Sequence, residues 1–388
     1  MKQNWEYKKL GECGMVITGN TPSKKDAVNY SSNDFCFVKP NDIEKDGITY
    51  INQTCEYISK EAFEKSRRLP KKSVLTTCIG IIGKVAILEV DAICNQQINA
   101  IIPNKGVDSK FLAYSILSIR NFLTQKANAP VVPIINKGDF SDVSIPVPPL
   151  TEQSRIVAEL DLLTGIINKQ KAQLKELDNL AQSIFYDMFG DPIENPKGWD
   201  VKKLGDMSSS VSYGTSLPSS PNGKYKYLRM NNITYDGFLD LTDLKYIDVD
   251  DDEFEKYSVR EGDILFNRTN SMDLIGKTTY IHGMEPMIIA GYIIRVRVVD
   301  SIMPVFVSKF MNTPAMKKKL RGMAKGAVNQ ANINSKELKS IDIILPPLKL
   351  QQDFADKIAS IEKQKSAINQ SIAETQKLLD YTMDKYFG

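Results

Sequence analysis

The chain has 388 residues, 42% hydrophobic and 25% charged, which is ordinary for a soluble globular protein of two or three units. Its longest apolar runs, such as Met287–Ile294, are too short to cross a bilayer, and the start MKQNWEYKKLGECG lacks the apolar core of a signal peptide. These features argue against a membrane or secreted protein, so we expect a cytoplasmic one. A net charge of +3 does not by itself indicate a nucleic-acid partner.

Residues 1–150 are predicted to form a first globular unit of the mixed α+β class. Short β-branched stretches, Val74–Thr77 and Ile79–Leu88, alternate with turns such as Asp46-Gly47, and one helix is expected over Ser109–Leu123. All five cysteines lie in this unit without a CxxC pair: Cys13, Cys36, Cys55, Cys78 and Cys94. Because none recurs in the repeat described below, we expect reduced thiols rather than a disulfide framework or a zinc site.

A long helix is predicted over residues 151–190. Apolar side chains recur there at alternating intervals of four and three residues, which is typical of the seam of a coiled coil. The seam includes Ile156, Leu160, Leu163, Ile167, Leu174 and Leu177, with Gln170 as a polar member. Pro148 and Pro149 precede the helix, and Gly190 is expected to end it before a Pro/Gly linker over 191–198.

The chain then repeats this plan. Trp5–Glu12 (WEYKKLGE) recurs as Trp199–Asp206 (WDVKKLGD), at an offset of 194 residues. The Pro-Pro-Leu at 148–150 recurs at 346–348, at an offset of 198 residues. A period this long indicates a duplicated domain rather than a solenoid repeat. We therefore expect a second globular unit of the same fold over 199–347.

Two helices of the second copy correspond to helices of the first. One is expected over Ser308–Leu320, and the other is a second long helix over 348–388. The long helix has the same heptad frame, with the seam residues Ile358, Ile361, Ile368, Ile372 and Leu379 and the polar Lys365. Two like helices in one chain can pair with each other, so we predict an intramolecular, antiparallel coiled coil. Pairing between two molecules is the alternative.

Several fragments imitate catalytic or metal-binding motifs but lack required residues. Ser271–Thr278 (SMDLIGKT) has a serine where a phosphate-binding loop needs its first glycine, and Asp248–Glu253 (DVDDDE) has Glu253 where a calcium loop needs glycine. The sole histidine, His282, is not duplicated, so a catalytic triad could exist in only one half. We predict no catalytic residues, no metal and no cofactor.

Two divergent units of one fold, separated by helices, suit the recognition of two unlike half-sites on duplex DNA. Arg and Lys contact guanine edges in the major groove, and Asn and Gln contact adenine. The candidates of the first unit are Lys39, Asn41, Lys84, Asn95, Gln96 and Gln97. Those of the second unit are Arg229, Asn231, Asn232, Asn267, Arg268, Lys277, Lys325, Asn329 and Gln330. For each residue, the alternative is an ordinary polar loop side chain.

Each copy also has a basic cluster. The first contains Lys65, Arg67, Arg68, Lys71 and Lys72, and the second contains Lys317, Lys318, Lys319, Arg321 and Lys325. Each cluster is either part of an electrostatic footprint for nucleic acid or a solvated helix face.

The order of these elements resembles the specificity subunit of Type I restriction–modification enzymes over the whole chain. Trp5–Gly11 and Trp199–Gly205 are similar to the start of that family's target recognition domains, and Pro148–Gln153 (PPLTEQ) is similar to the start of its conserved helix. Pro346–Gln351 reads PPLKLQ and departs from this pattern, with Leu350 where Glu152 stands in the first copy. An acid at this position is therefore not common to the two helix starts.

The resemblance implies a non-catalytic subunit in which each target recognition domain reads one half of a bipartite, asymmetric DNA site. Its implied partners are double-stranded DNA, two methyltransferase subunits docked on the helices, and restriction/translocase subunits; S-adenosylmethionine and ATP would belong to those partners. A specificity subunit of a related split restriction system, a stand-alone DNA-binding regulator and an enzyme with an unrecognised site are the alternatives.

Overall fold

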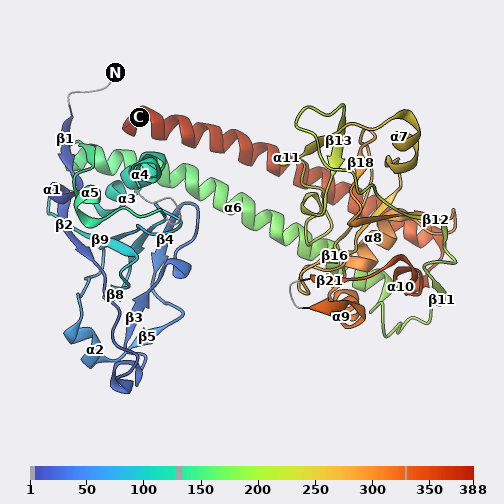
Figure 1. The fold of residues 1–388 in the computed structure, drawn as a ribbon, viewed down its shortest axis with the longest axis horizontal. Helices are drawn as coiled ribbons and strands as arrows, with labels where there is room; N and C mark the ends of the chain where they lie inside the picture. Colours follow the sequence, from blue (N-terminus) through green and yellow to red (C-terminus); the bar gives the residue numbers. More distant parts are fainter. Residues whose placement is uncertain (1–4, 128–132, 328–329) are drawn as a thin grey trace. The chain divides into compact units, whose positions relative to one another are not determined.

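The computed structural model describes residues 5–127, 133–327 and 330–388 (Figure 1). Contacts within the chain define two compact units, one formed by residues 1–170 with 370–388 and the other by 171–369. Two helices are long, α6 (Leu150–Phe189) and α11 (Leu348–Phe387). One part of each helix belongs to the first unit and the other part to the second. Each unit is therefore a globular α+β part with two helical stretches, as the sequence predicts.

The first unit contains a five-stranded and a three-stranded sheet. The larger sheet consists of β2 (Gly14–Thr18), β9 (Ile98–Pro103), β6 (Val74–Thr77), β7 (Val85–Leu88) and β4 (Ile48–Ile51), in that order. The smaller consists of β5 (Tyr57–Ile58), β3 (Phe35–Val38) and β8 (Ala92–Cys94), and β1 (Glu6–Lys9) pairs with β10 (Ser144–Val147). The helices are α1 (Leu10–Cys13), α2 (Lys60–Lys65), α3 (Ser109–Ser118), α4 (Arg120–Lys126) and α5 (Lys137–Ser141).

The second unit repeats this arrangement with different edges. Its four-stranded sheet consists of β12 (Ser208–Tyr213), β19 (Ile293–Val298), β15 (Ile264–Asn267) and β17 (Thr278–Tyr280). One three-stranded sheet consists of β14 (Lys245–Ile247), β13 (Tyr225–Leu228) and β18 (Ile288–Ile289), in that order. A second consists of β16 (Thr269–Asn270), β21 (Gln330–Asn332) and β20 (Lys325–Ala327). In addition, β11 (Asp200–Lys203) pairs with β22 (Asp342–Leu345). The helices are α7 (Asp251–Tyr257), α8 (Pro304–Asn312), α9 (Pro314–Met323) and α10 (Ser335–Lys339).

The two globular helices predicted as single elements are each divided. In the second unit Thr313 is extended (ψ 146°) between α8 and α9, because a residue before proline avoids the helical region. In the first unit the break falls at Ile119, after two serines whose hydroxyls bond to carbonyls of the preceding turn: Ser115 to Phe111 and Ser118 to Ser115. Such back-bonding bends helices.

One predicted strand is shorter than expected. The stretch Ile79–Leu88 is β-branched, yet only Val85–Leu88 forms a strand, β7. Gly80 and Gly83 adopt φ of 75° and 77°, so the chain turns there instead of extending. The prediction for Val74–Thr77 is confirmed by β6.

The long helices pair antiparallel within the chain, which confirms the predicted fold class. In the first unit, Gln170 Nε2 donates to Ser371 Oγ at 2.7 Å and the Tyr386 hydroxyl donates to Glu159 Oε2 at 2.6 Å. In the second unit, Lys365 Nζ lies 2.5 Å from Asp178 Oδ1. The two polar seam residues thus have partners on the facing helix. Gly190 ends α6 with φ 79°, and its N–H donates to the carbonyl of Tyr186 at 2.8 Å.

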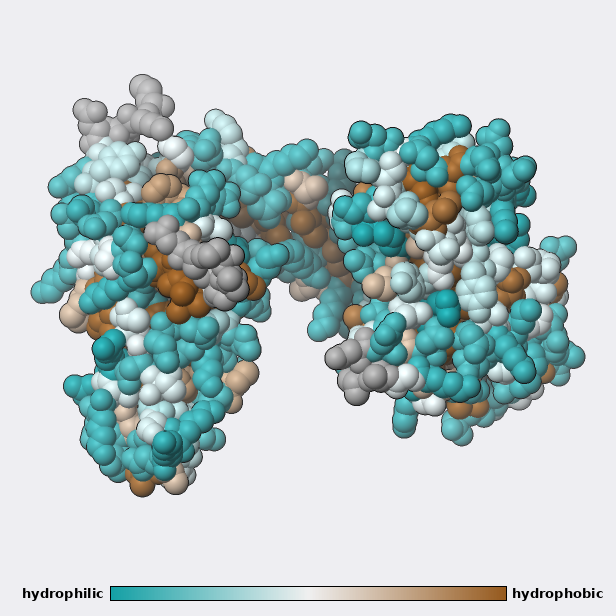
Figure 2. All heavy atoms as spheres, viewed as in Figure 1, coloured by the Kyte–Doolittle hydropathy of each residue, from teal (hydrophilic) through white to brown (hydrophobic). Residues whose placement is uncertain are grey.

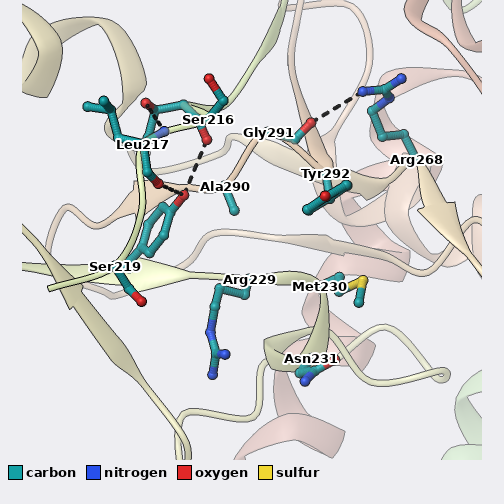
Figure 3. Close-up of a pocket in the computed structure, with 12 residues that line it drawn as sticks. Ser216, Leu217, Ser219, Arg229, Met230, Asn231, Arg268, Ala290, Gly291 and Tyr292 are labelled. Carbon is teal, nitrogen blue, oxygen red and sulfur yellow. Dashed lines mark hydrogen bonds between the residues drawn. The ribbon is translucent and has the colours of Figure 1, made fainter. Parts of the chain in front are cut away.

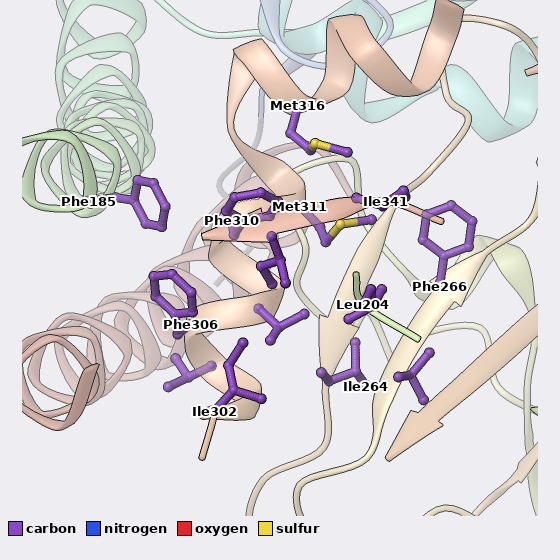
Figure 4. Close-up of a cluster of buried hydrophobic side chains, with 14 of the residues drawn as sticks. Phe185, Leu204, Ile264, Phe266, Ile302, Phe306, Phe310, Met311, Met316 and Ile341 are labelled. Atoms are coloured by element: carbon purple, nitrogen blue, oxygen red, sulfur yellow. The ribbon is translucent and has the colours of Figure 1, made fainter. Parts of the chain in front are cut away.

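Apolar seam residues face the interior of both units. Buried members are Ile156, Leu160, Leu163, Ile167, Leu177, Ile358 and Ile361, and half-buried members are Leu174, Ile368, Ile372 and Leu379. Figure 4 shows part of the core of the second unit, where Phe185 of α6 lies near Phe306 of α8. Their ring centroids are 5.8 Å apart.

Each globular part is attached to its following helix by one buried glutamine. Gln153 Oε1 accepts from the N–H of Asp108 at 2.8 Å, and Nε2 donates to the carbonyls of Pro148 and Gly106. Gln351 repeats this pattern with the N–H of Met303 at 2.9 Å and the carbonyl of Pro346 at 2.8 Å. Gln153 and Gln351 are the last residues of the PPLTEQ and PPLKLQ segments. The feature common to both helix starts is therefore this glutamine, and not the position before it, where Glu152 and Leu350 differ.

Candidate nucleic-acid interface

In both units a short turn follows the central strand of a three-stranded sheet, at the end where two parallel strands finish side by side. Val38 of β3 is level with Cys94 of β8, and Leu228 of β13 is level with Ile289 of β18. The sequence candidates Lys39 and Asn95 therefore lie at one edge, as do Arg229 and the loop after Ile289. This duplicated edge is where the two units can present different side chains on one scaffold.

Two candidate lysines stabilise this turn. Lys84 Nζ donates to the carbonyl of Pro40 at 2.7 Å and also to that of Ile43, and Lys277 Nζ donates to the carbonyl of Met230 at 2.9 Å. Lys277 is only 7% exposed, and burial lowers its pKa. Since both ammonium groups are used by backbone carbonyls in the same way, we assign them to the scaffold and not to DNA contact.

Amide side chains form the exposed part of the first unit's edge. Asn41 and Gln96 are exposed, and Gln96 Oε1 accepts from the Thr21 hydroxyl at 2.5 Å. Asn95 is buried and orients its neighbour, because its Nδ2 donates to Gln97 Oε1 at 2.9 Å. Lys39 is bonded to Glu56, which offsets its charge. The edge thus offers Asn41, Gln96 and Gln97 to a ligand.

A pocket of about 470 Å³ occupies the corresponding edge of the second unit (Figure 3). It brings together three sequence candidates, Arg229, Asn231 and Arg268, and adds the exposed ring of Tyr292. Arg229 Nη2 donates to Asp243 Oδ2 at 2.9 Å, and Asn231 is exposed. The pocket combines hydrogen-bond donors with an aromatic surface, as base-contacting sites do.

Two asparagines of the second unit are not available to a ligand. Asn232 is 1% exposed, and its Nδ2 donates to the carbonyls of Asp240 and Asp243 at 2.9 and 3.2 Å. Asn267 is fully buried and bonds weakly to the carbonyl of Met230 at 3.4 Å. We assign both to the scaffold, because an amide without exposed surface cannot reach a base edge in this conformation.

The antiparallel strands β20 and β21 lie beside the pocket through β16, in which Thr269 is level with Asn332 of β21. Lys325 and Gln330 are exposed, and Lys325 Nζ lies 2.6 Å from Glu337 Oε1. Asn329 falls outside the described residues. Gln330 therefore remains a candidate for DNA contact, whereas Glu337 offsets the charge of Lys325 as Glu56 offsets that of Lys39.

All five residues of the first basic cluster are exposed, as on a solvated face, and in the second cluster Lys317 is the buried member. In the first, Arg67 Nη1 donates to the carbonyl of Thr18 at 2.8 Å and Lys65 pairs with Glu61 at 2.5 Å. In the second, Arg321 donates to the Tyr235 hydroxyl at 2.8 Å, and Lys317 is buried with Nζ 3.0 Å from the carbonyl of Gly276.

Burial lowers the pKa of Lys317 to about 7, with Asp236 opposing the shift and Lys277 adding to it. Its pKa in the unfolded chain is about 10.5. Between these values the unfolded chain binds a proton that the folded chain lacks, so folding stability is expected to rise with pH from about 7 by up to ~1.4 kcal/mol per pH unit. Below pH 7 this contribution is constant. Urea unfolding from pH 6 to 9 measures it.

Lys317→Met should flatten this rise, whereas the exposed neighbour variant Lys318→Met should retain it. Equal pH dependence in both variants would contradict the assignment to Lys317.

Two features of the sequence that resemble metal-binding or catalytic motifs have structural explanations. Asp250 Oδ1 accepts from the N–H of Glu253 at 2.8 Å and caps α7, and His282 Nδ1 lies 2.6 Å from Glu261 Oε1 at the surface. Over 5–127, 133–327 and 330–388, no group of three or more His, Cys, Asp or Glu side chains is placed to hold a metal ion. Among the helices of these residues, none has the length and apolar character needed to cross a membrane.

Sequence reasoning missed two aromatic residues of the interface, Tyr213 and Tyr292. Tyr292 follows Ile289 by three residues, as Gln97 follows the equivalent Cys94, so alignment of the copies at these strands could have indicated it. Tyr213 ends β12 and offered no such signal, since its counterpart in the first unit is the small Thr18.

Residues 2–177 and 196–377 match the family described as Type I restriction modification DNA specificity domain, and the chain belongs to this family. The chain is 22% identical to the Type I restriction enzyme EcoKI specificity subunit of Escherichia coli K12, over 100% of this chain and 89% of that one. It is 24% identical to the StySPI specificity subunit of Salmonella potsdam, with the same coverage.

Solved structures share the fold. The S subunit of a Type I restriction–modification system from M. genitalium has a TM-score of 0.55 at 13% identity, covering 99% of this chain and 96% of that chain. A chain from a study of complex assembly and conformational transition of the type I R-M system also has a TM-score of 0.55, at 20% identity, covering 98% of this chain and 97% of that chain.

Proposed function

We propose that this chain is the DNA specificity subunit of a Type I restriction–modification system, and that each globular unit reads one half of a bipartite, asymmetric site. Family membership supports the general role. The observation that carries the finer proposal is the duplicated strand-end edge, which presents amides in the first unit and Arg229, Arg268 and Tyr292 in the second. Unlike side chains on one scaffold suit unlike half-sites.

We assign the chemistry to partner subunits: two methyltransferase subunits that dock on the paired helices, and restriction/translocase subunits. Large apolar side chains on the helical stretches of the first unit support docking there. Leu162 and Tyr381 are 65% and 68% exposed, and Ile166 and Leu378 are also exposed. Apolar residues are visible among hydrophilic ones on the molecular surface (Figure 2). Exposed apolar groups of this kind favour burial against a partner.

Co-expression with the methyltransferase subunit of the same system tests this function. We expect a stable complex and DNA methylation at defined sites only when this chain is present. DNA binding by the chain without any methyltransferase partner would favour a stand-alone regulator, and turnover of a substrate by the purified chain alone would favour an enzyme.

We further propose that the helix pair sets the spacing between the half-sites. Because Asp178 faces Lys365, a lengthened pair needs insertions in both helices: four residues after Leu177 and four after Lys365. The added length is roughly 6 Å at 1.5 Å per residue, which equals one or two base pairs. The preferred gap should grow by that amount, with both half-sites unchanged, when methylated sites are mapped.

A matched control carries the insertion in α6 alone. It displaces Asp178 from Lys365 and should lower stability instead of changing the gap. An unchanged gap in an active doubly inserted complex would contradict the spacing role.

A further inference from the structure

One arginine at the second unit's edge is held more rigidly than its neighbours. Arg268 joins β15 to β16, its N–H donates to the carbonyl of Tyr292 at 3.0 Å, and its carbonyl accepts from the N–H of Ile333 at 2.9 Å. The backbone is therefore fixed between the loop that carries Tyr292 and Ile333, the residue directly after β21.

The side chain is fixed as well. The guanidinium carbon of Arg268 lies 4.9 Å from the ring centroid of Tyr213, within the range of a cation–π contact. The Tyr213 hydroxyl is itself anchored, because it donates to Ser335 Oγ at 3.0 Å and accepts from the N–H of Ser335 at 2.9 Å. Because the anchored ring supports the planar guanidinium, the Arg268 side chain has few rotamers open to it. A ligand that binds it therefore loses less free energy to ordering this side chain.

The charge of this guanidinium is not neutralised. Throughout the described residues no carboxylate forms an ion pair with Arg268, whereas nearby Arg229 pairs with Asp243 at 2.9 Å and Lys325 with Glu337 at 2.6 Å. Among the described residues, the side chain of Arg268 makes one hydrogen bond, a long one from Nη1 to the carbonyl of Gly291 at 3.5 Å, and its Nε is buried without a partner there. The other N–H groups of Nη1 and Nη2 have no hydrogen-bond partner among the described residues and can donate to an external acceptor.

We propose that Arg268 reads a guanine in the half-site of the second unit, donating to O6 and N7 in the major groove. This inference rests on the proposed function. A half-buried, stacked guanidinium beside a pocket (Figure 3) has the fixed planar geometry that bidentate base recognition requires. A phosphate contact needs only positive charge, which a mobile lysine supplies.

The first unit has no arginine at the equivalent position, which lies among its described residues. Thr18 and Thr76 flank Asn99 in its sheet, as Tyr213 and Phe266 flank Ile294 in the second. Two residues after Thr76, the position of Arg268 is taken by buried Cys78, whose Sγ accepts from Asn99 Nδ2 at 3.2 Å. The guanine contact is thus specific to one half-site.

The test uses the full chain assembled with its methyltransferase subunits. Methylated sites are mapped for the parent and for Arg268→Ala, and binding is measured on oligonucleotides that vary one base pair at a time. We expect discrimination for G·C at one position of the second half-site to fall about 10- to 100-fold, with other positions unaltered. Tyr213→Leu should relax the same position to a smaller extent.

Arg268→Lys keeps the charge but not the bidentate fork, so it should relax the same position even if Arg268→Ala does not fold. Replacing that guanine by 7-deazaguanine, which lacks the N7 acceptor, should weaken binding of the parent more than that of Arg268→Lys, because lysine lacks the bidentate fork. Arg260→Ala is the matched control, because Arg260 is exposed, bonded to Glu255, and outside this pocket.

Uniform weakening across all sequences would overturn the proposal in favour of a phosphate contact, and an unaltered motif in both Arg268 variants would overturn it outright. If the parent complex methylates no defined sequence, the proposed function is wrong. The methylation map of the parent therefore separates failure of the proposed function from failure of the guanine contact.

Discussion

Replacing residues 12–145 with the corresponding unit of a family relative is expected to change one half of the methylated sequence completely and to leave the other half unchanged. The reason is that the second unit forms its own core and its own edge, with Arg268 and Tyr292 held by contacts inside residues 171–369. Mapping methylated sites of the chimaera measures both halves at once.

The chimaera must preserve the contacts between the replaced segment and the helices. Lys110 Nζ lies 2.6 Å from Asp161 Oδ2, the Tyr114 hydroxyl donates to Asp161 Oδ1 at 2.8 Å, and Phe111 packs against Phe387. The donor unit should therefore keep Lys, Phe and Tyr at these positions. The reciprocal replacement in the second unit serves as the control, and a chimaera in which both halves change together would rule out independent reading.

Phe185→Ala is expected to destabilise the second unit by about 3–5 kcal/mol, because a fully buried ring leaves a cavity that the surroundings fill only partly. Phe185 lies on α6, is 1% exposed, and packs against Phe189 and Phe354 with ring centroids 5.1 and 5.7 Å away. The end of α6 is thus part of the second unit's core and not merely a connection to it.

Hydrogen exchange of the second unit, together with urea unfolding, measures this loss without assuming that the whole chain unfolds in one step. Tyr381→Ala is the matched control, since this ring on α11 is 68% exposed and its removal should change stability by no more than about 0.5 kcal/mol. Equal effects of the two substitutions would contradict the role assigned to the helix end.

The repeated architecture could be predicted from sequence because its signals are local or periodic. The Pro-Pro-Leu starts, the heptad seams and Gly190 each specify backbone geometry within a few residues, and the structure contains the helices that they predict. Pro314 also indicated a helix break locally, but the prediction of one helix followed the uninterrupted segment Ser109–Leu123 of the first copy.

The interface was less predictable because exposure is a tertiary property. Asn231 and Asn232 are adjacent and chemically identical, but one is exposed and the other holds two carbonyls inside the fold. Likewise, the stacking of Arg268 on Tyr213 joins strands 55 residues apart in a sheet whose register no local pattern specifies. Residue type alone indicated candidate residues, but it did not distinguish residues that stabilise the fold from residues that are exposed to a ligand.

A methylation map of the parent complex tests the central claim most directly. Every site methylated only in the presence of this chain should contain two short, different sequence elements separated by a constant gap of unspecified base pairs. One uninterrupted recognition sequence, or methylation that does not depend on this chain, would contradict a bipartite specificity subunit.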